Sequence, residues 1–256
     1  MSSARERILT EAFVSIANSM VDGVDVVDLL SGLATDCARL LDVASAGLLL
    51  ADGHGVLHLV AASSERTRDL EIFQLQREQG PCLDCYRTGH PVNVDDLAAA
   101  ANRWPVFVPA AIEAGFASVH AMPLRLRETV LGALNLFGKQ VGPLRPDDLD
   151  LAQALAHVAS IALVADKAAG DKETVNQQLR TALVSRIAIE QAKGILSQHG
   201  NLDMEQSFAL LREHARSHHE RLSDVAQRVV TRELPAAQLL KRTRSLSHPE
   251  GADGST

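Results

Sequence analysis

The sequence predicts two structural classes in one chain of 256 residues. An α+β domain with a mostly antiparallel sheet and helices comes first, followed by a long connecting helix and an all-α module of three helices. Short apolar runs separated by turn residues stop before residue 146, which confines the expected strands to the front part. Residues 147–199 contain no proline, as expected for one long helix or two helices in tandem, and two further stretches have helical periodicity.

Periodicity and turn residues divide the front part into short elements. The motif DGHG joins two apolar runs, and Asp with Gly supplies the positive φ that a tight hairpin needs. Five strands are expected in this part. We expect helices over residues 4–20, 26–41 and 65–79 and within 104–115, and strands within 46–62, 90–96 and 116–138.

The expected division of the chain follows from these elements. Its parts are an N-terminal helix (1–21), the α+β domain (22–165), a helical linker (166–181), the three-helix module (182–235) and a disordered tail (236–256) rich in Ser, Gly, Arg and His. In the module, Asp203 with Gln206 fits a capping box, Ser223 is a natural N-cap, and Pro235 is expected to end the last helix.

Charge differs between the two parts. The chain has a net charge of -7, but residues 171–256 contain 12 basic and 11 acidic side chains, so the acidic excess lies in the front part. The overall charge argues against nonspecific binding to nucleic acids or membranes. Apolar runs are shorter than the roughly 20 residues of a membrane span, and the N-terminus MSSARERILTEAF is charged where a signal peptide is apolar. We therefore expect a cytoplasmic protein without membrane contact.

The long helix after residue 172 carries two apolar stripes on different sides. The first stripe, expected to be buried in the three-helix module, consists of Val184, Ala188, Ile189, Ala192, Ile195 and Leu196. The second stripe consists of Val175, Leu179, Leu183 and Ile187. Because each apolar side needs a partner, we expect the second stripe to pair with a second copy of the chain as a homodimer.

Basic side chains decorate the module, which has one aromatic residue, Phe208. A solvated surface is the ordinary explanation for any one of them, and Arg186 can pair with Glu190 one helical turn later. Lys193 is different because it is followed by Gly194, which costs a helix about 1 kcal/mol relative to alanine. A missing side chain lets another backbone approach, and the ammonium group favours an anionic one.

The stretch RIAIEQAKGILSQHGNLDMEQSFALLREHARSHHERLSDVAQRVV, residues 186–230, resembles the ANTAR domain, an RNA-binding module of bacterial transcription antitermination regulators. The motifs IEQAKGIL, SF..LR..A and RLSDVA occur in order and at the family's spacing. The resemblance implies a dimer that binds paired RNA stem-loops with short loops and so prevents an overlapping terminator from forming. Ser207, where the family usually has alanine, and the stretch SHHERL depart from the pattern.

The resemblance and the helical projection together give the candidate RNA-binding residues. They are Arg186, Ala192, Lys193, Gly194, Arg212, Ala215 and Arg216, with Lys193 and Arg212 as the best candidates for direct contacts. With one aromatic in the module, arginine planes and phosphate contacts must outweigh stacking on rings, which favours RNA loops. A helix-turn-helix DNA binder stays an alternative, although the third helix lacks a polar recognition face.

The stretches GPCLDCYRTGHPVNVDDL and SVHAMPLRLRETVLGALNLFG in the front part resemble a GAF domain, of the variety found before ANTAR modules in actinobacteria. The resemblance implies a sensor that holds a small-molecule ligand in a pocket over the sheet. Fold analogy identifies neither the ligand nor a cofactor. His58 and His120 fall in expected strands and are interpreted as ordinary sheet residues rather than haem ligands.

Cys82 and Cys85 form a C-x-x-C pair after Gly80 and Pro81. If the pair starts a helix, the helix dipole lowers the pKa of a thiol and favours redox chemistry. Half-buried small residues are the plainer interpretation. A zinc site would need further ligands such as Cys37 and His90, and their spacing does not require one.

The sequence as a whole predicts a signal-responsive RNA-binding regulator rather than an enzyme. In this hypothesis, a change in the first domain shifts helix packing along residues 146–187 and alters the distance between two RNA-binding modules. The alternative is a redox sensor or thiol enzyme, because some GAF-fold proteins reduce free methionine sulfoxide with cysteines. In that alternative the reactive residues are Cys82 and Cys85.

Overall fold

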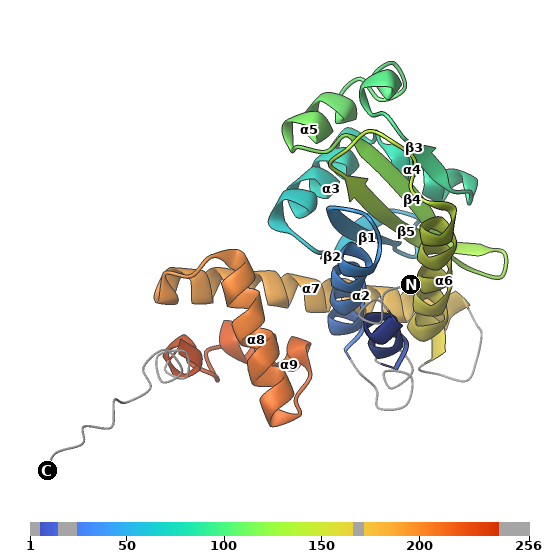
Figure 1. Cartoon of the computed structure of the whole chain (residues 1–256). Coiled ribbons are helices and arrows are strands. Elements are labelled where there is room, and N and C mark those ends of the chain that lie inside the picture. Colours follow the sequence, from blue (N-terminus) through green and yellow to red (C-terminus); the bar gives the residue numbers. More distant parts are fainter. Residues whose placement is uncertain (1–5, 15–24, 166–171, 241–256) are drawn as a thin grey trace, which may run out of the picture. The chain divides into compact units, whose positions relative to one another are not determined.

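The computed structural model describes residues 6–14, 25–165 and 172–240. The chain forms two compact units, which divide between Leu183 and Val184 (Figure 1). The first unit contains the sheet and the second is helical. Residues 6–14 are helical, and the rest of the opening helix expected over 4–20 lies outside the described residues.

An antiparallel sheet of five strands, in the order β2-β1-β5-β4-β3, organises the first unit. The strands are β1 (Ser45–Ala51), β2 (Leu57–Ala62), β3 (Val92–Val94), β4 (Ser118–Leu126) and β5 (Thr129–Gly138). β4 and β5 are joined by a tight turn in which Arg127 has a φ of 52°. All five strands lie where alternation and turn residues predicted them, which confirms the expected α+β fold.

Helices cover both faces of the sheet (Figure 1). α2 (Val26–Leu40) contacts β1 and β2, and α6 (Pro146–Ala165) contacts β4. On the other face, α3 (Glu65–Arg77) contacts β1 and β2, α4 (Pro81–Thr88) contacts β4 and β5, and α5 (Phe107–Glu113) contacts α3 and the short helix η1 (Ala98–Ala100). The two layers of helices leave strands β1, β4 and β5 almost wholly buried.

The alternation of side chains along the strands separates two cores. Val119 and Phe137 pack in one cluster with Cys82, Trp104 and Phe107, on the face covered by α3, α4 and α5. The neighbouring strand residues therefore point to the face covered by α2 and α6. One of these is a histidine of β4, so a polar side chain enters the second face.

The second unit consists of three helices in series. α7 (Lys172–Gly200) enters it at Val184, and α8 (Met204–His218) packs against α9 (Leu222–Val230). Residues 147–199 thus belong to two helices in tandem, with residues 166–171 outside the described part. The buried core of this unit includes Ala188, Ile189, Ala192, Leu196, Leu211, Ala215, Leu222, Val225, Ala226 and Val229.

The helix ends confirm one cap and correct another. Asp203 and Gln206 form the expected capping box at the start of α8. The expected N-cap Ser223 is wrong, because α9 begins one residue earlier, with Arg221 at the N-cap and Leu222 buried. The last helix also ends at Val230, before Pro235.

The tail expected to be disordered from residue 236 begins with an ordered turn. Residues 236–240 are helical, and Leu239 is buried. A buried leucine anchors this turn in a way that the polar composition of the tail concealed. Residues 241–256 lie outside the described part.

The apolar stripes of α7 differ in part from expectation. Val184, assigned to the buried stripe, is 66% exposed, and Ile195 is half-buried. In the second stripe Ile187 is 58% exposed and Leu183 is half-buried. The side chains of Val175 and Leu179 lie outside the described part.

Candidate nucleic-acid interface and sensor interior

One face of α7 carries a row of alternating charge. Arg186, Glu190 and Lys193 lie at spacings of four and three residues, so the three side chains share a face. The Arg186 guanidinium contacts Glu190 Oε1 at 2.6 Å, and the Lys193 ammonium donates to both Glu190 oxygens at 3.2 Å. The sequence indicated the first pair. The second also follows from an i,i+3 spacing, but the sequence analysis missed it.

Lys193 was expected to face an approaching RNA backbone, yet the structure buries it. The residue is 3% exposed, and its Nζ lies 5.9 Å from the centroid of the Phe208 ring on α8. Its aliphatic stem packs within the module while Glu190 and the ring face its charge, because a buried ammonium needs such compensation. In this structure, Lys193 can reach RNA only after its surroundings rearrange.

Gly194, directly after Lys193, matches the expectation of uncovered backbone. A Cβ built at this position would have no neighbouring heavy atom within 4 Å. The glycine therefore stands at an open patch of helix surface. Neither a turn nor crowding explains its presence.

The other candidate residues divide between core and surface. Ala192 and Ala215 are buried in the helical core, so the direct RNA contact expected from the family signature does not fit their positions. Their role in this structure is packing. Arg212 is half-buried, and Arg216 one turn later on α8 is exposed. Helical spacing places both arginines on the side of α8 that carries Phe208.

Two features near α8 and α9 were not found from the sequence. His214 and His218 stack with ring centroids 4.0 Å apart, and Arg228 of α9 forms an ion pair with Glu220. The spacing of four residues between the histidines is a signal that could have indicated their contact. The partner of Arg228 comes from the preceding loop, which a helical projection does not cover.

The interior of the first unit contains a fully buried carboxyl group. Glu71 of α3 accepts a hydrogen bond from Asn135 Nδ2 of β5 at 2.7 Å and a second from Gln74 Nε2. Burial raises the pKa of Glu71 to about 8, although both hydrogen bonds act in the opposite direction. The side-chain oxygens of Gln74 and Asn135 have no hydrogen-bond partner among the described residues. A neutral polar cluster therefore lies under the sheet, and a lone glutamate in a helical stretch did not reveal it.

The cysteine pair lies beside this cluster, and its chemistry differs from the sequence expectation. Cys82 and Cys85 do start α4, but both thiols are fully buried. Burial, with the nearby charge of Glu71, raises the pKa of Cys82 well above its usual value, and burial raises the pKa of Cys85 to about 12. Desolvation thus outweighs the helix dipole that was expected to lower them. The geometry does not support a reactive thiol pair.

The metal alternative finds no support in the described part of the chain. Cys37 is buried, burial raises the pKa of its thiol to about 12, and His90 is exposed. Among the described residues, no group of three or more His, Cys, Asp or Glu side chains is arranged to hold a metal ion.

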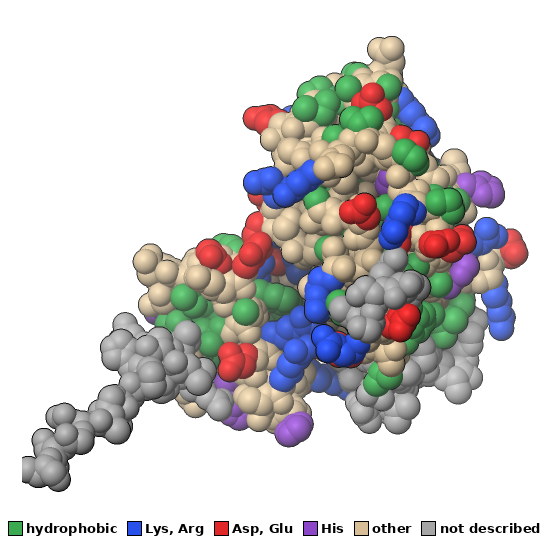
Figure 2. Space-filling view, viewed as in Figure 1, with side chains coloured by type: hydrophobic (Ala, Val, Ile, Leu, Met, Phe, Trp, Pro, Cys, Tyr) green, Lys and Arg blue, Asp and Glu red, His purple; other side chains and the backbone are tan. Residues whose placement is uncertain are grey.

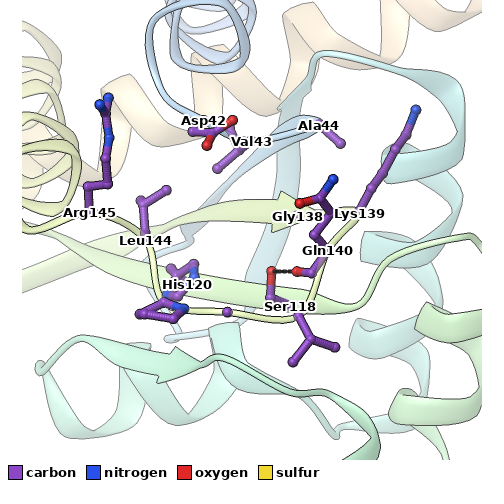
Figure 3. A pocket seen from close by; sticks show the side chains of 13 residues that line it. Asp42, Val43, Ala44, Ser118, His120, Gly138, Lys139, Gln140, Leu144 and Arg145 are labelled. Carbon is purple, nitrogen blue, oxygen red and sulfur yellow. Dashed lines mark hydrogen bonds between the residues drawn. The ribbon is translucent and has the colours of Figure 1, made fainter.

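A cavity of about 300 Å³ opens on the α2 and α6 side of the sheet (Figure 3). It is lined by residues 42–44, by Ser118 and His120 of β4, and by residues 138–145 after β5. His120 is 2% exposed, and its Nδ1 lies 3.2 Å from Asn93 Oδ1. Burial lowers the pKa of His120, so the imidazole is neutral at neutral pH. Figure 3 shows the side chains of Lys139 and Arg145 extending away from it.

Charge is distributed differently over the two units. Figure 2 shows acidic and basic side chains interspersed on the visible face of the first unit. None of the helices in the described ranges has both the length and the apolar character that a bilayer span requires.

Comparison with known families agrees with this architecture. Residues 23–164 match the GAF domain, and the chain belongs to this family. Residues 177–230 match the ANTAR domain, so the chain combines the two domains in the order that the sequence motifs indicated. This combination is that of a regulatory protein with a sensor domain and an RNA-binding antitermination domain.

Solved structures show the same fold for the first unit. The GAF domain of an Acinetobacter phosphoenolpyruvate-protein phosphotransferase is 17% identical with a TM-score of 0.50, covering 67% of this chain and 99% of that one. The corresponding domain from Coxiella burnetii is 15% identical with a TM-score of 0.46, covering 62% and 92%. A free methionine-R-sulfoxide reductase from Neisseria meningitidis is 14% identical with a TM-score of 0.44, covering 70% and 90%. No curated protein matches the chain.

Proposed function

We propose that the chain is a signal-responsive regulator that stabilises paired stem-loops in nascent mRNA and thereby causes transcription antitermination. The GAF domain receives the signal, and the ANTAR module binds the RNA in the cytoplasm. The observation that carries this proposal is the surface of α7, where the open backbone at Gly194 follows directly on the row Arg186, Glu190 and Lys193.

The proposed contact combines close approach with charge. An RNA loop can lie against the bare helix surface at Gly194, while the exposed Arg216 meets phosphates from α8. Phosphate contacts of this kind position a nucleic acid and make its binding depend on salt. Arg186 and Arg212, which are half-buried, would strengthen the contact when the loop is seated.

We further propose that two copies join through α7. Val184 and Ile187 are exposed on this helix, and apolar side chains of that size favour burial against a partner. Because the module has few basic residues, one copy binds weakly, and two modules on two loops gain affinity through avidity. The signal then acts by changing the distance between the modules.

For the sensor domain we propose a small polar ligand in the cavity beside His120. The neutral imidazole donates one ring hydrogen to Asn93 and keeps a lone pair for a ligand donor. Pocket size and a few convergent polar groups are typical of small-molecule sites.

RNA binding is tested with the full chain and an RNA of two short-looped hairpins. Replacing Arg216→Ala should weaken binding about fivefold and reduce the slope of log affinity against log salt by about 0.7, as expected for one lost phosphate contact. Arg87→Ala, which removes an exposed arginine from the first unit, is the matched control and should leave both values unchanged. Absence of binding by the unchanged protein would refute the proposed function.

The dimer is tested by sedimentation velocity. Ile187→Asp should dissociate the dimer because it places a charge in the proposed apolar contact. Ile112→Asp, at an exposed isoleucine of α5, is the control and should leave the dimer intact. A monomeric unchanged protein, or equal behaviour of the two variants, contradicts the proposal.

A further inference from the structure

Glu190 satisfies two cations at once, and this arrangement is unusual on a surface proposed to bind an anion. Its carboxylate contacts Arg186 on one side and Lys193 on the other, with contacts between 2.6 and 3.2 Å. The Glu190 side chain is 22% exposed, so solvent reaches the carboxylate while the ammonium of Lys193 is covered. The two cations, seven residues apart on one helix, thus converge on a single anionic group.

A carboxylate held in this way occupies the position that suits a phosphate. Both groups present several anionic oxygens, and both bind guanidinium and ammonium donors at similar distances. Lys193 cannot lose its counter-ion while it stays buried, because an unpaired buried charge is strongly unfavourable. A phosphate can therefore reach these cations only by replacing Glu190 or by joining it against the repulsion of two negative charges.

We propose that Glu190 is a specificity-determining residue, which holds the anion site between Arg186 and Lys193 and excludes RNA that offers charge alone. The inference rests on the proposed RNA-binding function. An unstructured RNA gains little, because its phosphate replaces a contact that already exists. A hairpin loop shaped to the module gains additional contacts at the open backbone of Gly194 and at Arg216, and these compensate for the displacement.

The proposal differs from a purely structural role for Glu190. A residue that only stabilises the helix would change the stability of the module and weaken binding of every RNA by the same factor. A residue that excludes RNA by charge changes the ratio between two RNAs. The ratio of affinities for a two-hairpin RNA and for polyadenylate of equal length therefore separates the two roles.

The test measures both affinities by fluorescence anisotropy with the full chain, unchanged and as Glu190→Gln. The variant should bind polyadenylate about fivefold more tightly at low salt, the effect of removing one like charge near a phosphate. Binding of the two-hairpin RNA should improve less, so the affinity ratio narrows. Glu213→Gln, at an exposed glutamate of α8, makes the same change in net charge and should leave the ratio unchanged.

Two further variants keep the test decisive if Glu190→Gln is poorly folded by circular dichroism. Glu190→Asp retains the carboxylate and should preserve the ratio. The double variant Glu190→Gln with Lys193→Gln removes the buried charge together with its partner and should lose the gain for polyadenylate. An unchanged ratio in Glu190→Gln, or an equal loss for both RNAs, overturns the proposal. Failure of the unchanged protein to bind the two-hairpin RNA instead refutes the proposed function itself.

Discussion

Two glutamates, one in each unit, show two solutions to the burial of a carboxyl group. Glu71 lies under the sheet of the sensor domain among the amides of Gln74 and Asn135, and burial raises its pKa to about 8. Glu190 lies on α7 between two cations and keeps part of its surface in solvent. Neutral partners leave a carboxyl group responsive to pH, whereas charged partners make it responsive to salt and to competing anions. The predictions below use this difference.

The largest expected effect is the dependence of stability on pH that Glu71 causes. Because its folded-state pKa is raised from 4.5 to about 8, the folded chain holds a proton that the unfolded chain has lost. This contribution to the free energy of unfolding is complete below pH 4.5 and is lost as the pH rises through about 8. The loss can reach about 4 kcal/mol, and urea unfolding between about pH 7 and about pH 8.5 measures most of its upper part.

Glu71→Gln is the control for this effect, because glutamine has the same shape and does not titrate. Its stability should be nearly constant over the same range. His120 acts with the opposite sign, since its lowered pKa costs stability only as the pH falls through its usual value of 6.5. Parallel slopes for the variant and the unchanged protein would show that Glu71 is ionised when folded.

A smaller effect is expected from Gly47→Ala in β1. A Cβ at this position would overlap the Glu71 carboxyl group, which has no room to move within the buried cluster. The variant should lose about 2 kcal/mol of stability, the usual size of an overpacked core. Thermal unfolding compares it with Gly142→Ala, where a Cβ meets nothing within 4 Å and the loss reflects the positive φ alone. Equal losses would mean that the cluster is loosely packed.

The smallest effect is expected from the cysteines. The thiols of Cys82 and Cys85 are buried and their pKa values are raised, so mild peroxide should leave RNA binding unchanged. The double variant Cys82→Ala with Cys85→Ala should bind the two-hairpin RNA like the unchanged protein. Thiol titration with a chromogenic disulfide reagent should be slow when folded and fast in urea. Rapid reaction of the folded protein would restore the redox alternative.

The sequence predicted those parts of the fold that depend on local signals. Alternating apolar residues and the Asp-Gly turn placed β1 and β2, and the pair Asp203 and Gln206 marked the start of α8. Both signals act over a few residues, so no tertiary contact could reverse them. The motifs likewise indicated the two domains, because their residues lie close together in the chain.

The candidate sites depend on tertiary contacts and were therefore predicted less well. Lys193 was expected outside, but Phe208 from another helix covers it. Cys82 was expected to have a lowered pKa, but strands distant in sequence bury it. Glu71 attracted no notice because its partner Asn135 is 64 residues away. Gly194 was predicted correctly because a bare position in a helix is visible in the sequence itself.

The measurement that tests the account most directly is the substitution Gly194→Ala, followed by both thermal unfolding and RNA binding. An added methyl group meets no neighbour, so the variant should be more stable by up to about 1 kcal/mol. It should also bind the two-hairpin RNA several-fold more weakly, because the methyl group occupies the space that the RNA backbone needs. A more stable variant that binds this RNA with unchanged affinity would contradict the assignment of the open backbone to RNA recognition.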